Sequence, residues 1–138
     1  MKVLADTSGL FAALVRNDRM HLPAKATMTR LLLEEFDLCT TSYVLLETLA
    51  LLQARVGLHA ADEFERTLRP RFEVIWVGGT LHERAFRRLG LRQTHGCSLV
   101  DCCSFVVMED QGIQQAFGYD KHFSDEGFRL VREASDLD

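Results

Sequence analysis

Short apolar segments alternate with longer amphipathic segments along this chain, and this alternation restricts its fold more than any other feature. Strands are predicted over 2–5, 37–40, 72–77, 114–118 and 128–130, and helices over 10–15, 23–35, 43–56, 59–68, 80–89 and 98–108. Strand–helix–strand units build parallel sheets, so the pattern predicts an α/β fold with a central parallel sheet and helices on both faces. No linker or repeat interrupts it, and we expect one domain over 1–138.

Composition narrows the class of protein. The chain is 47% hydrophobic and 26% charged, as soluble globular proteins are. The longest apolar run, 44–52, is interrupted by Glu47 and Thr48 and is too short to span a bilayer, and the N-terminus does not resemble a signal peptide. We therefore expect a cytoplasmic protein that does not enter the membrane. The cysteines lack paired metal-site spacing and are expected to be reduced, mostly buried thiols: Cys39, Cys97, Cys102 and Cys103.

Two aspartates directly follow predicted strands. Asp6 ends the first strand and Asp120 lies just beyond the fourth. The carboxyl edge of a parallel sheet is where ligands bind, so both are candidate site residues. Helix capping by Asp6 and a turn role for Asp120 are the structural alternatives.

Two further carboxylates lie on predicted helices. Glu47 stands in the strongly apolar segment 43–52, which predicts a largely buried helix. A buried carboxylate is normally paired, protonated or bound to a metal, and a salt bridge to an arginine is the alternative. Asp101 follows Ser98 at capping-box spacing, and a helix start can hold a carboxylate ionised beside a cation. Four oxygen donors favour Mg²⁺ or Mn²⁺ over zinc.

The order of these motifs resembles the PIN-domain family. The relevant segments are Val-Leu-Ala-Asp6-Thr7-Ser8, Thr41-Ser42-Tyr43-Val44-Leu45-Leu46-Glu47, Ser98-Leu99-Val100-Asp101 and Phe117-Gly118-Tyr119-Asp120-Lys121-His122-Phe123. The resemblance runs over almost the whole chain. It departs from the family at Gly118, where many members carry a Thr or Ser that supports the site.

The resemblance implies a three-layer PIN-like fold and Mg²⁺- or Mn²⁺-dependent hydrolysis of RNA phosphodiester bonds. Asp6 and Asp101 would be the main cation ligands, and Glu47 and Asp120 would complete the coordination or hold water beside the cation. Ser8 or Thr7 would assist by hydrogen bonding, with helix capping as the alternative.

A chain of this size is also similar to the VapC toxins of toxin–antitoxin pairs and to solitary RNA-processing PIN nucleases. The toxin likeness implies an antitoxin partner and a homodimer. The leucine-rich segments 31–33 and 44–52 carry more apolar surface than a small core is expected to bury, which also favours an interface.

A net charge of −4 argues against RNA binding by bulk charge alone, so local arginines are expected to contact the substrate. The candidates are Arg84, Arg87 and Arg88, with Arg92 beyond them, and the residues nearer the acids, Arg16, Arg19 and Lys121. The alternative for the arginine-rich helix is a solvated face partnered by Glu83. The histidines are interpreted as surface or packing residues: His21, His59, His82, His95 and His122.

Two other functions are alternatives to a nuclease. A phosphotransfer domain with an aspartyl intermediate would require a second aspartate two positions after Asp6, where Ser8 stands. The second alternative is a PIN-like fold retained only for RNA or protein binding. Nothing in the sequence requires this alternative, since all four acids are present.

Overall fold

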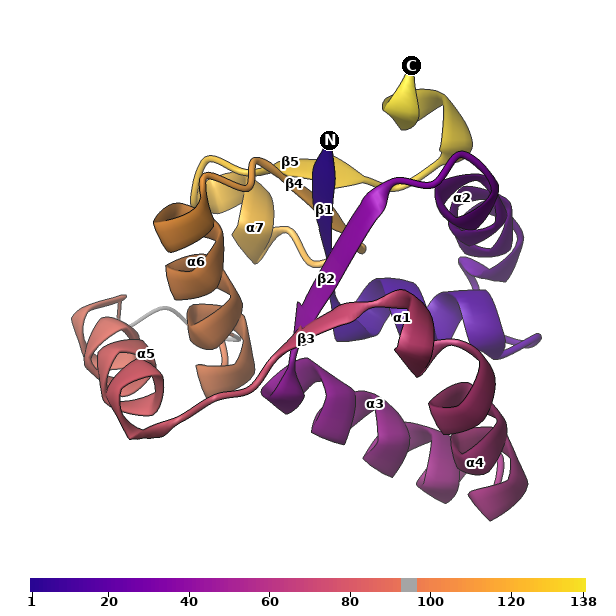
Figure 1. Ribbon diagram of the computed structural model, residues 1–138, viewed down its shortest axis with the longest axis horizontal. Coiled ribbons are helices and arrows are strands. Elements are labelled where there is room, and N and C mark those ends of the chain that lie inside the picture. The colour runs from indigo at the N-terminus through magenta and orange to yellow at the C-terminus, as the bar shows by residue number, and fades with distance from the viewer. Residues whose placement is uncertain (93–96) are drawn as a thin grey trace.

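Five parallel strands form one sheet in the computed structural model, which describes residues 1–92 and 97–138. The strands are β1 (Lys2–Ala5), β2 (Asp37–Thr41), β3 (Glu73–Ile75), β4 (Gln115–Phe117) and β5 (Arg129–Val131). Their order is β3-β2-β1-β4-β5, and every neighbouring pair is parallel (Figure 1). The predicted fold class is confirmed.

Helices cover both faces of the sheet. One face packs against α1 (Thr7–Leu14), α2 (His21–Leu33), α3 (Ser42–Arg55) and α4 (Leu58–Thr67). The other carries α5 (Gly79–Arg92), α6 (Leu99–Gln111) and the short α7 (His122–Asp125) (Figure 1). Two 3-10 turns, Arg69–Arg71 and Ala134–Leu137, complete the elements. Successive strand residues point to opposite faces, so Val3 and Ala5 belong to the first core and Leu4 to the second.

The strand order contains a topological switch between β1 and β4. The chain runs from β1 to β2 and β3 on one side, then returns past β1 to place β4 and β5 on the other. Connections leave β1 and β4 in opposite directions at their carboxyl ends, and this opens a crevice there. The crevice is bordered by the residues that follow the two strands, including Asp6 and Asp120.

Helix α1 starts directly after β1 and packs very close to β4. It begins at Thr7 and not near Leu10 as predicted, because Asp6 caps its first turn. A Cβ atom placed on Gly9 would lie 2.6 Å from the carbonyl oxygen of Phe117. Only glycine fits that contact, which holds the start of α1 against the end of β4.

The expectation that α3 is a largely buried helix is wrong. Only one side of it is buried, through Val44, Leu45, Thr48 and Leu52, whereas Leu46 is 68% exposed and Glu47 is partly exposed. The helix covers the sheet with one face, and apolar composition cannot tell a core-facing leucine from one that faces outward. The related expectation of surplus apolar surface is confirmed at Leu46 and at Leu33, which is also exposed.

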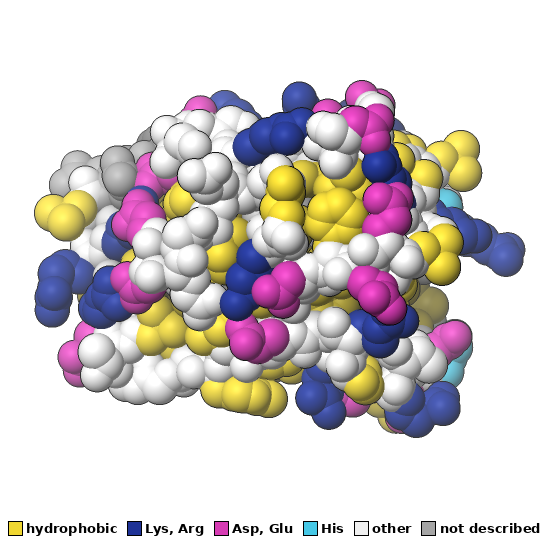
Figure 2. All heavy atoms as spheres, turned by 45° about the horizontal axis from the view of Figure 1, so that its top comes forward, with side chains coloured by type: hydrophobic (Ala, Val, Ile, Leu, Met, Phe, Trp, Pro, Cys, Tyr) yellow, Lys and Arg dark blue, Asp and Glu magenta, His cyan; other side chains and the backbone are white. Residues whose placement is uncertain are grey.

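Other features agree with the sequence-based picture. The four cysteines are free thiols, three of them buried and Cys97 half-buried. Within residues 1–92 and 97–138, no helix combines the length and apolarity needed to cross a membrane. Basic and acidic side chains alternate on the face seen in Figure 2, as expected for a surface with ion pairs such as Lys2–Glu73. The loop expected around His95 lies outside the described residues.

Candidate active site

The four candidate carboxylates line one cavity at the carboxyl edge of the sheet. Its volume is about 540 Å³, and its walls come from β1–α1, the α1–α2 loop, α3, the start of α6 and the segment after β4. Asp6, Glu47, Asp101 and Asp120 all border it, although they are spread over most of the sequence. Asp6 and Asp101 are 3% and 6% exposed, so two carboxylates are nearly removed from solvent here.

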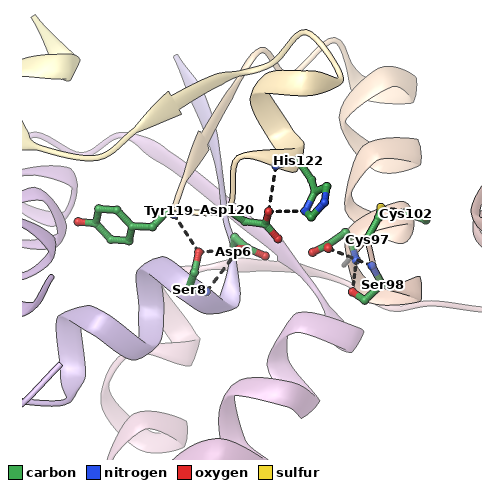
Figure 3. A network of polar contacts seen from close by, with 9 residues as sticks. Asp6, Ser8, Cys97, Ser98, Cys102, Tyr119, Asp120 and His122 are labelled. Carbon is green, nitrogen blue, oxygen red and sulfur yellow. Dashed lines mark hydrogen bonds and ion pairs between the residues drawn. The ribbon is translucent and has the colours of Figure 1, made fainter. Parts of the chain in front are cut away.

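Asp6 is held by the start of α1. Its Oδ2 accepts hydrogen bonds from the Ser8 backbone N at 3.3 Å and from Ser8 Oγ at 2.7 Å. Ser8 Oγ also accepts a hydrogen bond from the Tyr119 N at 2.9 Å (Figure 3). The Ser8 hydroxyl thus joins the segment after β1 to the segment after β4, which fixes the two sides of the crevice together.

Gly118 explains why that hydroxyl comes from Ser8. A Cβ atom on Gly118 would lie 2.8 Å from Ser8 Oγ and 3.1 Å from the Cβ of Asp6. The departure from the family pattern at this position therefore makes room for Ser8 against the β4 segment. Thr7, the other auxiliary candidate, also lines the cavity.

Asp101 is fixed by the capping box at the start of α6. Its Oδ2 accepts a hydrogen bond from the Ser98 N at 3.1 Å, and the Asp101 N donates to Ser98 Oγ at 3.1 Å. The capping role and a site role coexist, because only one carboxylate oxygen takes part in the cap. The helix start also favours negative charge at this position.

Asp120 is held by the turn into α7. Its Oδ1 accepts hydrogen bonds from the His122 N at 2.9 Å and contacts His122 Nδ1 at 2.6 Å (Figure 3). Asp101, Asp120 and His122 each offer a ligand atom, and these atoms lie within 4.8 Å of one another. The sequence predicts a surface or packing role for His122, and the structure places its half-buried ring against Asp120, beside the acidic cluster. The available signal was its place two residues after Asp120, where an Asx-type turn folds a side chain back on the acid.

Glu47 reaches the cavity from α3. The helix is capped by Thr41, whose Oγ1 accepts a hydrogen bond from the Val44 N at 3.1 Å. Glu47 lies nearly two turns beyond that cap, and Leu51, about one further turn along, also borders the cavity. Glu47 is thus partly exposed and lines the same cavity as the three aspartates. It is not the deeply buried carboxylate that the sequence predicts.

Burial and mutual repulsion raise the pKa values of the inner aspartates. Burial is the main reason that the pKa of Asp6 is raised to about 6 and that of Asp101 to about 7. The negative charges of Asp6 and Asp120 raise the pKa of Asp101 further. Carboxylates crowded in this way are destabilised when ionised, unless a positive charge joins them.

The donor set fits a hard divalent cation. Each aspartate uses one oxygen to hold its own loop or helix end, so the other oxygen can face a cation. Carboxylate oxygens together with water suit Mg²⁺ or Mn²⁺, and the imidazole of His122 lies at the same cluster.

The candidate RNA-binding residues fall into two groups. Arg84 forms a bidentate ion pair with Asp110, at 2.6 and 2.8 Å, and Arg88 pairs with Glu109 and Glu126. These pairs fasten α5 to α6 and α7, away from the acids. Arg87 is exposed on α5, and the side chain of Arg92 lies outside the described residues.

The second group lies near the acids. Arg19 lines the acidic cavity, and Arg16 and Arg19 both line a neighbouring hollow. Lys121 is exposed between Asp120 and His122.

Comparisons with known proteins agree with the resemblance found in the sequence. A family model described as "PIN domain" matches residues 3–128. The 23S rRNA-specific endonuclease VapC20 of Mycobacterium tuberculosis is 38% identical over 94 residues, which cover 67% of this chain and 72% of the relative. The crystal structure of M. tuberculosis VapC20, described as a Sarcin-Ricin loop cleaving toxin, superposes with a TM-score of 0.81 at 34% identity, over 94% of this chain and 98% of that one. FitAcB from Neisseria gonorrhoeae shares the fold at 12% identity, with a TM-score of 0.67 over 95% and 96% of the two chains.

Proposed function

The chain belongs to the PIN-domain family, and from this premise we propose that it is a metal-dependent endoribonuclease of the VapC toxin type. The observation that carries the proposal is the convergence of Asp6, Glu47, Asp101 and Asp120 on one cavity at the switch point of the sheet. The similarity to a relative named as an rRNA endonuclease and toxin supports RNA as the substrate class. Ribosomal RNA is accordingly the first substrate to test.

In this proposal Asp6, Asp101 and Asp120 hold the cation, Mg²⁺ or Mn²⁺. Each binds it through the carboxylate oxygen that takes no part in the local helix cap or turn. A bound divalent cation would lower the pKa of an attacking water and neutralise charge on the scissile phosphate. Glu47, which lines the same cavity from α3, would orient water there and accept its proton. His122 keeps Asp120 in place through its ring contact with Oδ1.

Cleavage of purified ribosomes and of protein-free RNA, with Mn²⁺, Mg²⁺ or EDTA, tests this function. Wild-type protein should cut with metal and fail with EDTA, and Asp101→Asn should be inactive with its fold intact by circular dichroism. Full activity of Asp101→Asn would remove that residue from the mechanism. Metal-independent cutting would overturn the proposed chemistry.

We also propose that the protein forms a homodimer through an apolar face on α3, the β3–α5 connection and α5. Leu46, Trp76 and Phe86 are each more than 60% exposed on these elements. The elements are joined at Tyr43 and His82, whose rings meet edge to face at 5.9 Å. Light scattering should give a dimer mass for the wild type and a monomer mass for Trp76→Glu. A monomeric wild type over the whole concentration range would contradict the dimer.

An antitoxin is the second proposed partner. Carboxylates whose pKa values are raised by burial, and further by neighbouring negative charges, are suited to an arginine side chain, which can displace the cation and pair bidentately. Co-expression with the neighbouring gene product tests this partner. Failure to co-purify and to inhibit cleavage would favour the solitary RNA-processing nuclease instead.

A further inference from the structure

A second hollow adjoins the acidic cavity. Its volume is about 1080 Å³, and it lies between the end of α1 with its following loop, the end of α3 and the start of α4. Phe11, Asp18 and Arg19 line both the hollow and the cavity, so the two adjoin, and together they are called the groove below. A strand bound at the carboxylates could extend past these three residues into the hollow.

Helix α3 runs along this groove with one face. Glu47 and Leu51 border the cavity and Arg55 borders the hollow, at spacings of four residues that put all three on the same side of the helix. Eight residues of α-helix span about 12 Å, which corresponds to about three or four phosphates of a stacked strand. The helix thus presents a carboxylate at the reaction site and an arginine a few nucleotides away.

The charge of the hollow is mainly basic. Arg16, Arg19 and Arg55 are exposed on its walls, and among the ion pairs described for residues 1–92 and 97–138 none involves these three. The remaining charged wall residues are Asp18, which accepts a hydrogen bond from the Met20 N at 2.8 Å, and Glu63. Three guanidinium groups against two carboxylates leave a net positive wall beside an acidic cavity.

An aromatic ring lies where the cavity and the hollow meet. The guanidinium of Arg55 is 5.9 Å from the centroid of the Phe11 ring, within the range of a weak cation–π contact. This contact helps to direct Arg55 along the groove. An aromatic face beside arginines is the combination that proteins use to bind single-stranded nucleic acid.

We propose that this hollow binds a single-stranded RNA segment next to the bond that is cut, with Arg16, Arg19 and Arg55 contacting its phosphates. The inference rests on the proposed ribonuclease function and extends it to the path of the substrate. Arg55 is the new element, because nothing in its sequence context singles it out. RNA is favoured over a polypeptide occupant because the basic walls are continuous with the proposed site of phosphodiester hydrolysis.

The test separates binding from cleavage. Binding of a short fluorescein-labelled single-stranded RNA is measured by anisotropy over a range of salt concentrations, in EDTA, for the full chain and for variants. Arg55→Gln should weaken binding about threefold to tenfold and lower the slope of log affinity against log salt by about 0.7, the value for one lost phosphate contact on a single strand. Arg55→Lys should keep the slope, because it keeps the charge.

Arg129→Gln is the matched control, since Arg129 is an exposed arginine on β5 that borders neither the acidic cavity nor the hollow. Its affinity and slope should equal those of the wild type. If Arg55→Gln has the affinity and the salt slope of the wild type, the hollow does not bind RNA, and a polypeptide partner becomes the better occupant. This conclusion would hold even if the wild-type protein cleaves RNA with Mn²⁺. Absence of cleavage by the wild type, with the Arg55→Gln effect present, would instead count against the proposed function alone.

Discussion

Replacing Asp6 with asparagine should stabilise the metal-free protein at alkaline pH. The pKa of Asp6 is about 6 in the folded protein, against an ordinary value of 3.8. This difference corresponds to about 3 kcal/mol, by which ionised Asp6 destabilises the folded state relative to the unfolded chain. Asparagine carries no charge, and its carbonyl oxygen can still accept from Ser8. The amide of asparagine fits the hydrogen bonds from Ser8 less well than the carboxylate does, which offsets part of this gain. We therefore expect the free energy of unfolding of Asp6→Asn to be about 1–2 kcal/mol higher than that of the wild type at pH 8.

The sign of the pH dependence follows from the raised pKa. Below about pH 4 the carboxyl is protonated in both states, and the stability that it contributes is fully present. As the pH rises through 6 the folded protein must ionise a buried group, so this stability is lost and the variant gains its advantage. The advantage should therefore be present at pH 8 and should give way near pH 4 to a small deficit, which is the cost of the less well matched amide.

Urea unfolding in EDTA, followed by far-ultraviolet circular dichroism at both pH values, measures this difference. Asp62→Asn is the control, since Asp62 is an exposed carboxylate on α4 that pairs with its helix neighbour Arg66, and it should change stability by less than about 0.5 kcal/mol. An Asp6→Asn protein that is less stable than the wild type at pH 8, by an amount that does not vary with pH, would refute the argument.

Three further outcomes are expected. Gly9→Ala should lower the free energy of unfolding by about 2–4 kcal/mol, because its Cβ would lie 2.6 Å from the Phe117 carbonyl oxygen, and thermal unfolding would show this. Ser8→Ala should cost about 1–2 kcal/mol, since it leaves the Tyr119 N without its acceptor, and should reduce cleavage by displacing Asp6; wild-type stability would contradict the bridging role. Mn²⁺ at a hundredfold excess over its dissociation constant should stabilise the wild type by about 2.7 kcal/mol in urea unfolding, and a stability unchanged by Mn²⁺ would argue against a cation site.

The strands and the acids that follow them could be predicted because local patterns define both. Asp6 and Asp120 each come directly after a short apolar run, and parallel topology brings such positions to one edge. Asp101 could be predicted for a similar reason, since its capping box with Ser98 is a local motif. In each case the residue and its partner lie within a few positions of one another.

Features that depend on packing between distant elements could not be predicted. The exposure of Glu47 and Leu46 follows from which side of α3 meets the sheet, and an apolar helix sequence does not encode that side clearly. The same limit applies to the arginines. Arg84 and Arg88 look like a phosphate-binding pair on an isolated helix, yet the packing of α5 on α6 places Asp110 and Glu109 opposite them. Arg55 becomes a groove residue only when α3 lies beside α1.

The central position of β1 has a consequence for the synthesis of this protein. β1 is synthesised before the other strands of the sheet, but one of its two neighbours, β4, is synthesised only after β2 and β3: Val3 pairs with Gln115. Until β4 is made, one edge of β1 stays unpaired. The backbone N–H of Asp6 also lacks its hydrogen-bond acceptor, the carbonyl oxygen of Phe117. Since Asp120 lies beyond β4, a nascent or truncated chain that lacks this segment cannot assemble the proposed hydrolytic centre. A protein that cuts RNA would thus be unable to act on the message and the ribosome that are still producing it.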